Sequence, residues 1–243
     1  MGRRFFASLL ALVFASIVSR VALAAPTIEI NGTDVTSALC GSESVCRGTD
    51  YTVAGNYELN SWDFFLQPDP SITSSFTLTN LSSIKQTFFL TVTLPVVALG
   101  SPVSISGSVG TGTLTDVNGG GATLTDVGPS TSIYEALIDG SSVQTLLDPP
   151  QTFSVISSPS GGPGSPVSIG PESFGPTFLA QSVNSSIGMR LGFTLTAGDS
   201  VYLPETFGVI AAVPEPTSYA MLLAGLGLMG FVMRRRKQDV LAA

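Results

Sequence analysis

The sequence predicts an all-β protein whose body is an antiparallel, β-sandwich-like domain. Three observations indicate this class: apolar and polar residues alternate with period two, turn-forming pairs interrupt the alternation at short intervals, and threonine and valine, which favour strands, are frequent. Many short strands joined by frequent turns are typical of two antiparallel sheets that share one core. We therefore expect a single β domain over residues 25–212.

Two stretches give the strongest strand signal. In residues 86–94 and 187–195, one face is apolar while the other carries mostly threonine, glycine or arginine. Strict alternation predicts strands with one face in the core and the other in water. Pairs such as Asn31-Gly32 and Asn118-Gly119 predict the turns between strands. The predicted core faces consist of Phe88, Leu90, Val92 and Leu94 in the first stretch and of Ile187, Met189, Leu191, Phe193 and Leu195 in the second.

Two other segments depart from this pattern. Tyr134–Leu147 is the one stretch of the body that could form a helix, although Gly140 interrupts it. Ser157–Gly170 is dense in serine, glycine and proline, which predicts a long loop. Because the alternation resumes after this loop, we expect it to lie inside one domain.

A five-residue repeat, Thr-Leu-Thr-Asp-Val, occurs at residues 113–117 and again at 123–127. With glycines between the two copies, the simplest interpretation is a pair of strands joined by a hairpin. Asp116, Asn118 and Asp126 also carry the hard oxygen ligands that calcium favours. Since the full ligand pattern of an EF-hand loop is absent, the hairpin without metal is the favoured interpretation, and we expect no cofactor.

Cys40 and Cys46 are the two cysteines of the chain. In an exported protein, such a close pair is expected to form a local disulfide that fixes a surface turn. A metal site would lack its other soft ligands, and a redox pair usually has Cys-x-x-Cys spacing.

Four aromatic residues lie close together in the sequence. Tyr57, Trp62, Phe64 and Phe65 could form an aromatic platform for a sugar ring. The strand-like pattern around them favours the alternative that they belong to the core.

The charge composition excludes several functions. The chain has no histidine, which removes histidine-based triads and histidine metal ligands. The body has a net charge of −12, because residues 25–213 contain 15 acidic and 3 basic residues. Such a body repels nucleic acid, which we do not expect as a partner. Hydrolysis by carboxylates alone stays open as a minor alternative, since acidic residues are present but not paired in the sequence.

The N-terminal residues have the three parts of a secretory signal peptide. Arg3 and Arg4 precede an apolar run, and Ala22 and Ala24 supply the small residues that signal peptidase requires. We therefore expect residues 1–24 to be removed by signal peptidase and the body to be exported.

The C-terminal residues predict a second membrane element. Residues 217–233 are apolar or small and are just long enough to span a bilayer. Residues 234–237, which are Arg234, Arg235, Arg236 and Lys237, should stop translocation and stay in the cytoplasm, followed by a short tail at 238–243. Before the span, Pro214 and Pro216 favour an extended backbone that an enzyme could grip outside the membrane.

The order Val-Pro-Glu-Pro, short glycine-containing span and basic cluster at residues 213–237 resembles the PEP-CTERM sorting signal of Gram-negative bacteria. The resemblance implies that exosortase, a membrane enzyme, recognises Pro214, Glu215 and Pro216 and cuts near them. It also implies passage through the inner membrane, with the body on the periplasmic side, before the protein reaches the cell surface or the extracellular matrix.

Together these observations predict an exported, non-enzymatic surface or matrix protein that exosortase sorts. The alternatives are a carbohydrate-binding module, with or without calcium, and the carboxylate-only glycoside hydrolase. Extracellular polysaccharide is the expected partner in the first of these alternatives.

Overall fold

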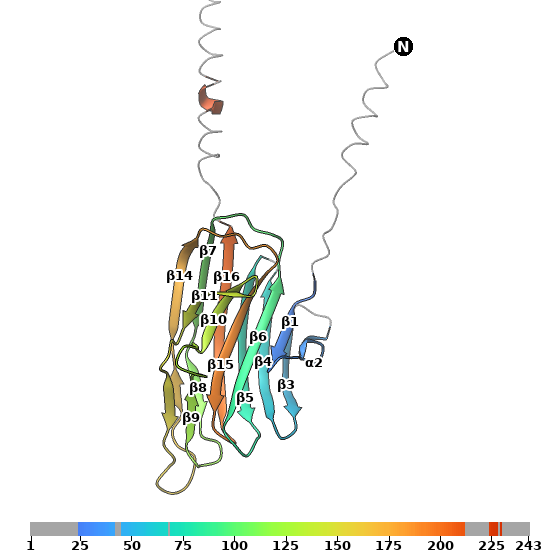
Figure 1. Ribbon diagram of the computed structural model, residues 1–243. Helices are drawn as coiled ribbons and strands as arrows, with labels where there is room; N and C mark the ends of the chain where they lie inside the picture. Colours follow the sequence, from blue (N-terminus) through green and yellow to red (C-terminus); the bar gives the residue numbers. More distant parts are fainter. Residues whose placement is uncertain (1–23, 42–44, 68, 212–223, 228, 230–243) are drawn as a thin grey trace, which may run out of the picture.

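The computed structural model describes residues 24–41, 45–67, 69–211, 224–227 and 229. The body consists of two antiparallel sheets arranged as two layers, as Figure 1 shows. The predicted all-β class is therefore confirmed. The strands also span the range that the sequence predicts for the body, since the first begins at Thr27 and the last ends at Ala211.

The first sheet has the strand order β11-β10-β15-β6-β1-β2, and β9 joins it beside β15 and carries β12. Its longest strands, β6 and β15, are the two stretches with strict alternation, and they pair with each other. The strands of this sheet are β1 (Thr27–Ile30), β2 (Thr33–Asp34), β6 (Gln86–Pro95), β9 (Ala122–Thr125), β10 (Tyr134–Ile138), β11 (Ser141–Leu146), β12 (Thr152–Val155) and β15 (Ser186–Leu195).

The second sheet has the order β13-β8-β16-β5-β4-β3, and β7 joins it beside β16 and carries β14. Its central strand, β16, pairs with β5 along one edge and with β7 and β8 along the other. The strands of this sheet are β3 (Val45–Val53), β4 (Tyr57–Gln67), β5 (Ser71–Asn80), β7 (Val103–Val109), β8 (Gly112–Thr115), β13 (Val167–Ile169), β14 (Glu172–Leu179) and β16 (Ser200–Ala211).

One hydrophobic core fills the space between the two sheets. Every predicted core residue of β6 and β15 is buried in it. Rings from opposite sheets meet there: Tyr57 of β4 packs edge-on against Phe88 of β6 with centroids 6.1 Å apart. The Tyr134 hydroxyl of β10 donates to the Thr206 carbonyl of β16 at 2.9 Å. Fully burying each large apolar side chain contributes roughly 1.5–3 kcal/mol, so this shared core holds the layers together.

The core is contained within the body. Its buried members lie between Ile28 and Val209, and both sheets close within the same range. A segment with its own core and complete sheets has what an independently folding domain requires.

The predicted helix at Tyr134–Leu147 is wrong, because this segment forms the hairpin of β10 and β11. Asp139 and Gly140 adopt positive φ values of 49° and 77°, which turn the chain in two residues. An Asp-Gly pair is a strong signal for such a turn. Burial of all five residues of β10 then outweighs their helix propensity.

The two copies of the Thr-Leu-Thr-Asp-Val repeat form the predicted strands β8 and β9, but the predicted hairpin is wrong. The strands belong to different sheets: β8 pairs with β13 and β16, whereas β9 pairs with β12 and β15. Residues 116–121 therefore form an arch that crosses from one layer to the other. The same local pattern fits both arrangements, because alternation fixes the inward face of a strand and not its neighbours.

The predicted long loop also crosses between the layers. It begins after β12 of the first sheet and includes the short strand β13 of the second sheet. The predicted loop therefore connects the two sheets, but its residues Val167–Ile169 form a strand.

A short helix, α2 (Thr36–Cys40), follows β2 and lies at the edge of the sandwich beside β1 and β3 (Figure 1). The Cys40–Cys46 disulfide, which the sequence predicted, connects α2 to β3. The Trp62 indole donates to the Leu39 carbonyl at 3.1 Å and so attaches α2 to β4.

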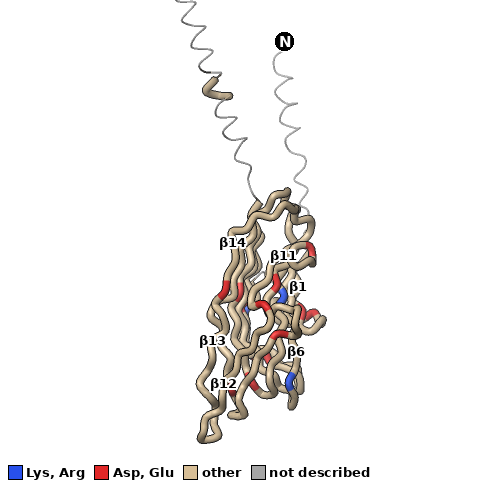
Figure 2. The backbone as a smooth tube through the Cα atoms, turned by 60° about the vertical axis from the view of Figure 1, so that its left-hand side comes forward, with Lys and Arg blue, Asp and Glu red and all other residues tan. Residues whose placement is uncertain are grey.

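Acidic residues are scattered along the chain of the body, and basic ones are few (Figure 2). Two ion pairs are present among the described residues, Arg47 with Asp63 and Arg190 with Glu135. Arg47 and Asp63 are both exposed, so their pair contributes roughly 0–1 kcal/mol, whereas Glu135 is largely buried beside the exposed Arg190.

Candidate functional site

The segment that follows β16 is the first candidate site. The predicted recognition residues Pro214, Glu215 and Pro216 and the basic cluster 234–237 lie outside the described residues, as do residues 1–23 of the predicted signal peptide. The structure does describe where the segment leaves the body. Ala211, the last residue of β16, pairs with Val103 of β7, so the exit point is fixed by the central strand of a sheet.

β1 begins and β16 ends at the same end of the sandwich (Figure 1). Within the parts of the chain that the structure describes, no helix has the length and apolarity needed to cross a membrane. Most of the predicted span at 217–233 lies outside those parts.

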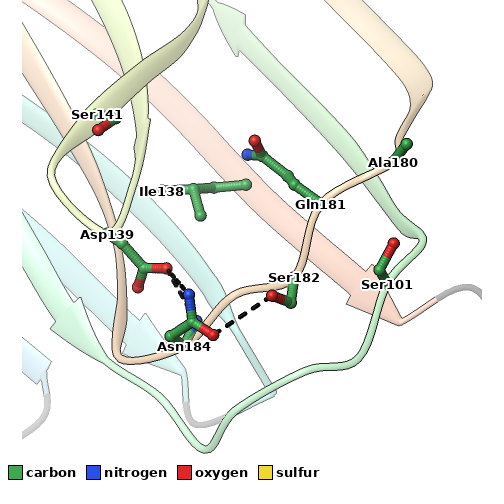
Figure 3. Close-up of a pocket in the computed structure, with 8 residues that line it drawn as sticks. All are labelled: Ser101, Ile138, Asp139, Ser141, Ala180, Gln181, Ser182 and Asn184. Atoms are coloured by element: carbon green, nitrogen blue, oxygen red, sulfur yellow. Dashed lines mark hydrogen bonds between the residues drawn. The ribbon is translucent and has the colours of Figure 1, made fainter.

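A polar pocket of about 380 Å³ lies beside the exit point. Ser101, which precedes β7, contributes one wall, while the β10–β11 turn and the connection from β14 to β15 contribute the others. Figure 3 shows the lining residues, which come from these three segments and are mainly hydroxyl and amide side chains around Ile138: Ser101, Ile138, Asp139, Ser141, Ala180, Gln181, Ser182 and Asn184.

Asp139 holds the connection that forms the pocket wall. Its carboxylate accepts bonds from the backbone N–H groups of Asn184 at 2.9 Å, Ser185 at 2.8 Å and Ser186 at 3.1 Å. The side chains of Asn184 and Ser185 donate to it as well. Partial burial raises the pKa of Asp139, but these bonds outweigh it and lower the pKa to about 2. The carboxylate is therefore ionised at neutral pH, and its oxygens already accept hydrogen bonds from residues 184–186.

The chemistry that this pocket offers is hydrogen bonding. Its serine hydroxyls and the Gln181 amide can donate to and accept from a polar ligand. No lining residue is a histidine, cysteine or lysine, and the one carboxylate of the lining, that of Asp139, already accepts bonds from residues 184–186.

Comparison with known protein families identifies the exit segment. Residues 212–237 match the family model described as the PEP-CTERM protein-sorting motif. The segment is a PEP-CTERM sorting motif. The predicted resemblance is thereby confirmed for these residues, and the motif supports an exported protein that exosortase processes and that is destined for the cell surface or the extracellular space. No curated protein matches the chain.

The calcium candidates are not gathered at one point. Asp116 and Asn118 are in the arch, whereas Asp126 follows β9, about 13 Å further along at strand spacing. The Asp126 carboxylate accepts from the Gln151 N–H at 2.5 Å. Among the described residues, no three His, Cys, Asp or Glu side chains gather where they could hold a metal ion.

Asp116 instead stabilises the arch. Its carboxylate oxygens accept from the Gly119 N–H at 2.7 Å and from the Gly164 N–H at 3.0 Å. Asp199, which precedes β16, is buried and accepts from the N–H of the arch residue Val117. Burial raises the pKa of Asp199, bonds from Thr196 and Val117 oppose this, and the nearby Asp116 raises the pKa further.

The aromatic platform suggested by the sequence is absent, and the favoured alternative of a core role is correct for three of its four residues. Tyr57, Trp62 and Phe64 are buried, because they occupy the inward positions of β4. Phe65 occupies an outward position and is 41% exposed.

Proposed function

We propose that this protein is a non-enzymatic component of the cell surface or extracellular matrix that exosortase sorts through residues 212–237. The observation that carries the proposal is the PEP-CTERM motif directly after the central strand of a self-contained β body. In this proposal the motif is the sorting signal, and the β body is the part that reaches the cell surface or matrix.

The proposed route has three steps. Signal peptidase removes residues 1–24 during export. The span at 217–233 and the basic cluster at 234–237 then hold the chain in the inner membrane, with the body on the periplasmic side. Exosortase finally binds Pro214, Glu215 and Pro216 and cuts near them, which frees the body from its transient anchor.

A non-enzymatic role is supported by what the carboxylates do. Asp116, Asp139 and Asp199 accept backbone N–H bonds that fix loops, and Glu135 pairs with Arg190. Groups with these structural tasks are poor candidates for the acid and base of a glycoside hydrolase.

The sorting proposal is tested by replacing Pro214, Glu215 and Pro216 with alanine in the full chain. We expect a longer form that stays in the membrane fraction, because the enzyme loses its recognition sequence while the span is unchanged. Immunoblots of the membrane, cell-surface and medium fractions give the readout.

The matched control replaces Thr217 and Ser218 with alanine, which changes the neighbouring residues and keeps Pro-Glu-Pro. This variant should be processed like the native chain. If the Pro-Glu-Pro variant is shortened and released at the native rate, the assignment of these residues to sorting is wrong.

A further inference from the structure

The outer face of the second sheet has an unusual composition. We use the term hydroxyl face for the outward positions of β5, β7, β8 and β16, whose opposite faces are buried in the core. On β5, every outward residue carries a hydroxyl group. The hydroxyl-bearing residues of the face are Ser71, Thr73, Ser75, Thr77 and Thr79 on β5, Ser104, Ser106 and Ser108 on β7, Thr113 and Thr115 on β8, and Ser200, Tyr202 and Thr206 on β16.

The hydroxyl face carries no charged side chain. The remaining outward positions of β16 are Pro204, Gly208 and Ile210. This neutrality contrasts with the net charge of −12 over residues 25–213. Glu58 and Asp63 border the face on β4, opposite Thr79 and Ser75 of β5, and Arg47 lies beyond Asp63 on β3.

The exposed aromatic rings of the body gather on the same side of this sheet. Among the described residues, three aromatic side chains are exposed: Tyr202 at 38%, Phe65 at 41% and Phe178 at 71%. Tyr202 stands within the hydroxyl face, while Phe65 and Phe178 border it on β4 and β14. Single exposed rings are ordinary, but the position of all three on the outer side of the same sheet is not explained by strand propensity.

The register arranges these groups in rows across the strands. One row runs from Phe65 through Thr73, Thr206 and Ser108 to Ser173. A second row places Tyr202 between Thr77 of β5 and Thr113 of β8. Neighbouring strands are about 4.8 Å apart, so a row offers a hydroxyl group at nearly every step.

Hydrogen bonds hold some of these hydroxyl groups in place. The side chains of Ser108 and Thr206 lie 2.8 Å apart, and the Ser61 hydroxyl donates to Thr77 at 3.1 Å. Groups fixed in this way lose little further freedom when a ligand binds.

We propose that the hydroxyl face and its bordering rings bind a neutral polysaccharide. Pyranose rings present apolar CH faces that pack on aromatic rings and hydroxyl groups that exchange bonds with serine and threonine. An acidic body disfavours an anionic polymer. A purely apolar partner would bury these hydroxyl groups without bonds, which is costly. The inference rests on the proposed delivery to the cell surface and names the partner met there.

The test uses the body, residues 25–212, whose core and sheets are complete. Affinity electrophoresis through gels that contain soluble neutral polysaccharides, xyloglucan, hydroxyethylcellulose and dextran, measures retention against gels with alginate, an anionic polymer. We expect retention in at least one neutral gel and none in alginate. Replacing Phe65, Phe178 or Tyr202 with alanine should weaken binding by roughly two- to tenfold for each ring.

Two further variants test whether the polymer binds at this face and through its hydroxyl groups. Ile84→Ala with Ile156→Ala removes exposed apolar side chains of other surfaces and should leave retention unchanged. Thr73→Val with Thr206→Val keeps shape and strand propensity but removes two hydroxyl groups. Retention by a polysaccharide should fall in that variant, whereas an apolar partner would bind it better.

The proposal is overturned if the native body is not retained by any neutral polymer, or if the ring variants are retained equally. It is also overturned if light scattering shows that the native body self-associates and that the ring variants abolish this, because the face would then join two copies. Since the body lacks the sorting motif, these outcomes are independent of the Pro-Glu-Pro experiment.

Discussion

Glu205 is the most unusual residue of the core. It occupies an inward position of β16 and is 1% exposed. Its Oε2 atom accepts from the Ser74 hydroxyl, while its Oε1 atom has no hydrogen-bond partner. Burial raises the pKa of Glu205 well above its usual value, and the bond from Ser74 opposes this only in part. Tyr134 lies close enough that Glu205 contributes, after burial, to a raised pKa of the phenol.

This carboxyl group makes stability depend on pH. Because its pKa is higher in the folded than in the unfolded state, its contribution is fully present below the unfolded pKa of about 4.3 and is lost as pH rises through the folded pKa. Between the unfolded and the folded pKa, the free energy of unfolding of the native protein should fall as pH rises, and Glu205→Gln should remove this fall. The stability of the variant relative to the native protein should therefore rise by about 1.4 kcal/mol per pH unit over that range. Urea unfolding at a series of pH values from 4 upwards, the lowest within about 0.5 of the unfolded pKa, measures the effect.

Neighbouring serines on β5 provide the matched pair of controls. Ser74→Ala removes the one partner of the Glu205 carboxyl group and should cost about 1–3 kcal/mol. Ser75 points outward, so Ser75→Ala should stay within about 0.5 kcal/mol of the native value. Parallel pH profiles for the Gln variant and the native protein would contradict the role given to Glu205.

At the scale of elements, the sequence predicted strands well and their partners poorly. Strands β6 and β15 could be predicted because one face of each is buried and apolar while the other carries mostly polar or small residues, which leaves a period of two in the sequence. The arch after β8 could not be predicted from the local sequence, because residues far along the chain decide between an arch and a hairpin. The Gly164 N–H donates to Asp116, and the Val117 N–H donates to Asp199.

The same reasoning applies to the candidate sites. The sorting motif is a linear signal, so the sequence alone identified it. The hydroxyl face could not be found in this way, because Thr73, Thr206 and Ser108 become neighbours only through the register of three strands. Outward threonines look alike until the sheet order is known.

The connection between β14 and β15 depends on a single carboxylate. Asp139→Asn should weaken the bonds to residues 184–186, with a cost of about 1 kcal/mol at neutral pH after allowing for its exposure. The pKa of Asp139 is lowered to about 2, so its contribution is present above the unfolded pKa of about 3.9 and is lost as pH falls through 2.

Thermal unfolding of the native protein and of the Asp139→Asn variant is compared at pH 7 and near pH 2. The two curves should differ at pH 7 and converge at the low pH. Asp69→Asn, in the turn between β4 and β5, is an exposed control that should leave the curve unchanged at pH 7. A difference of the same size at both pH values would show that the Asp139 charge is not what holds this connection.

At the scale of the whole molecule, the sorting motif and the β body are separate parts of one chain. The motif at 212–237 follows the last strand, and no core residue among those described lies beyond Val209. Processing can therefore remove the tail without removing any of this packing.

This separation predicts that a chain ending at Ala212, with its signal peptide retained, is exported and folds as the processed protein does. Its free energy of unfolding should agree with that of the processed protein within about 0.5 kcal/mol, in one cooperative transition. A chain ending at Gly198 is the control: it lacks β16, which pairs with β5, β7 and β8, and should not fold. If the chain ending at Ala212 aggregates or unfolds in two steps, residues beyond Ala212 contribute to the fold as well as to sorting.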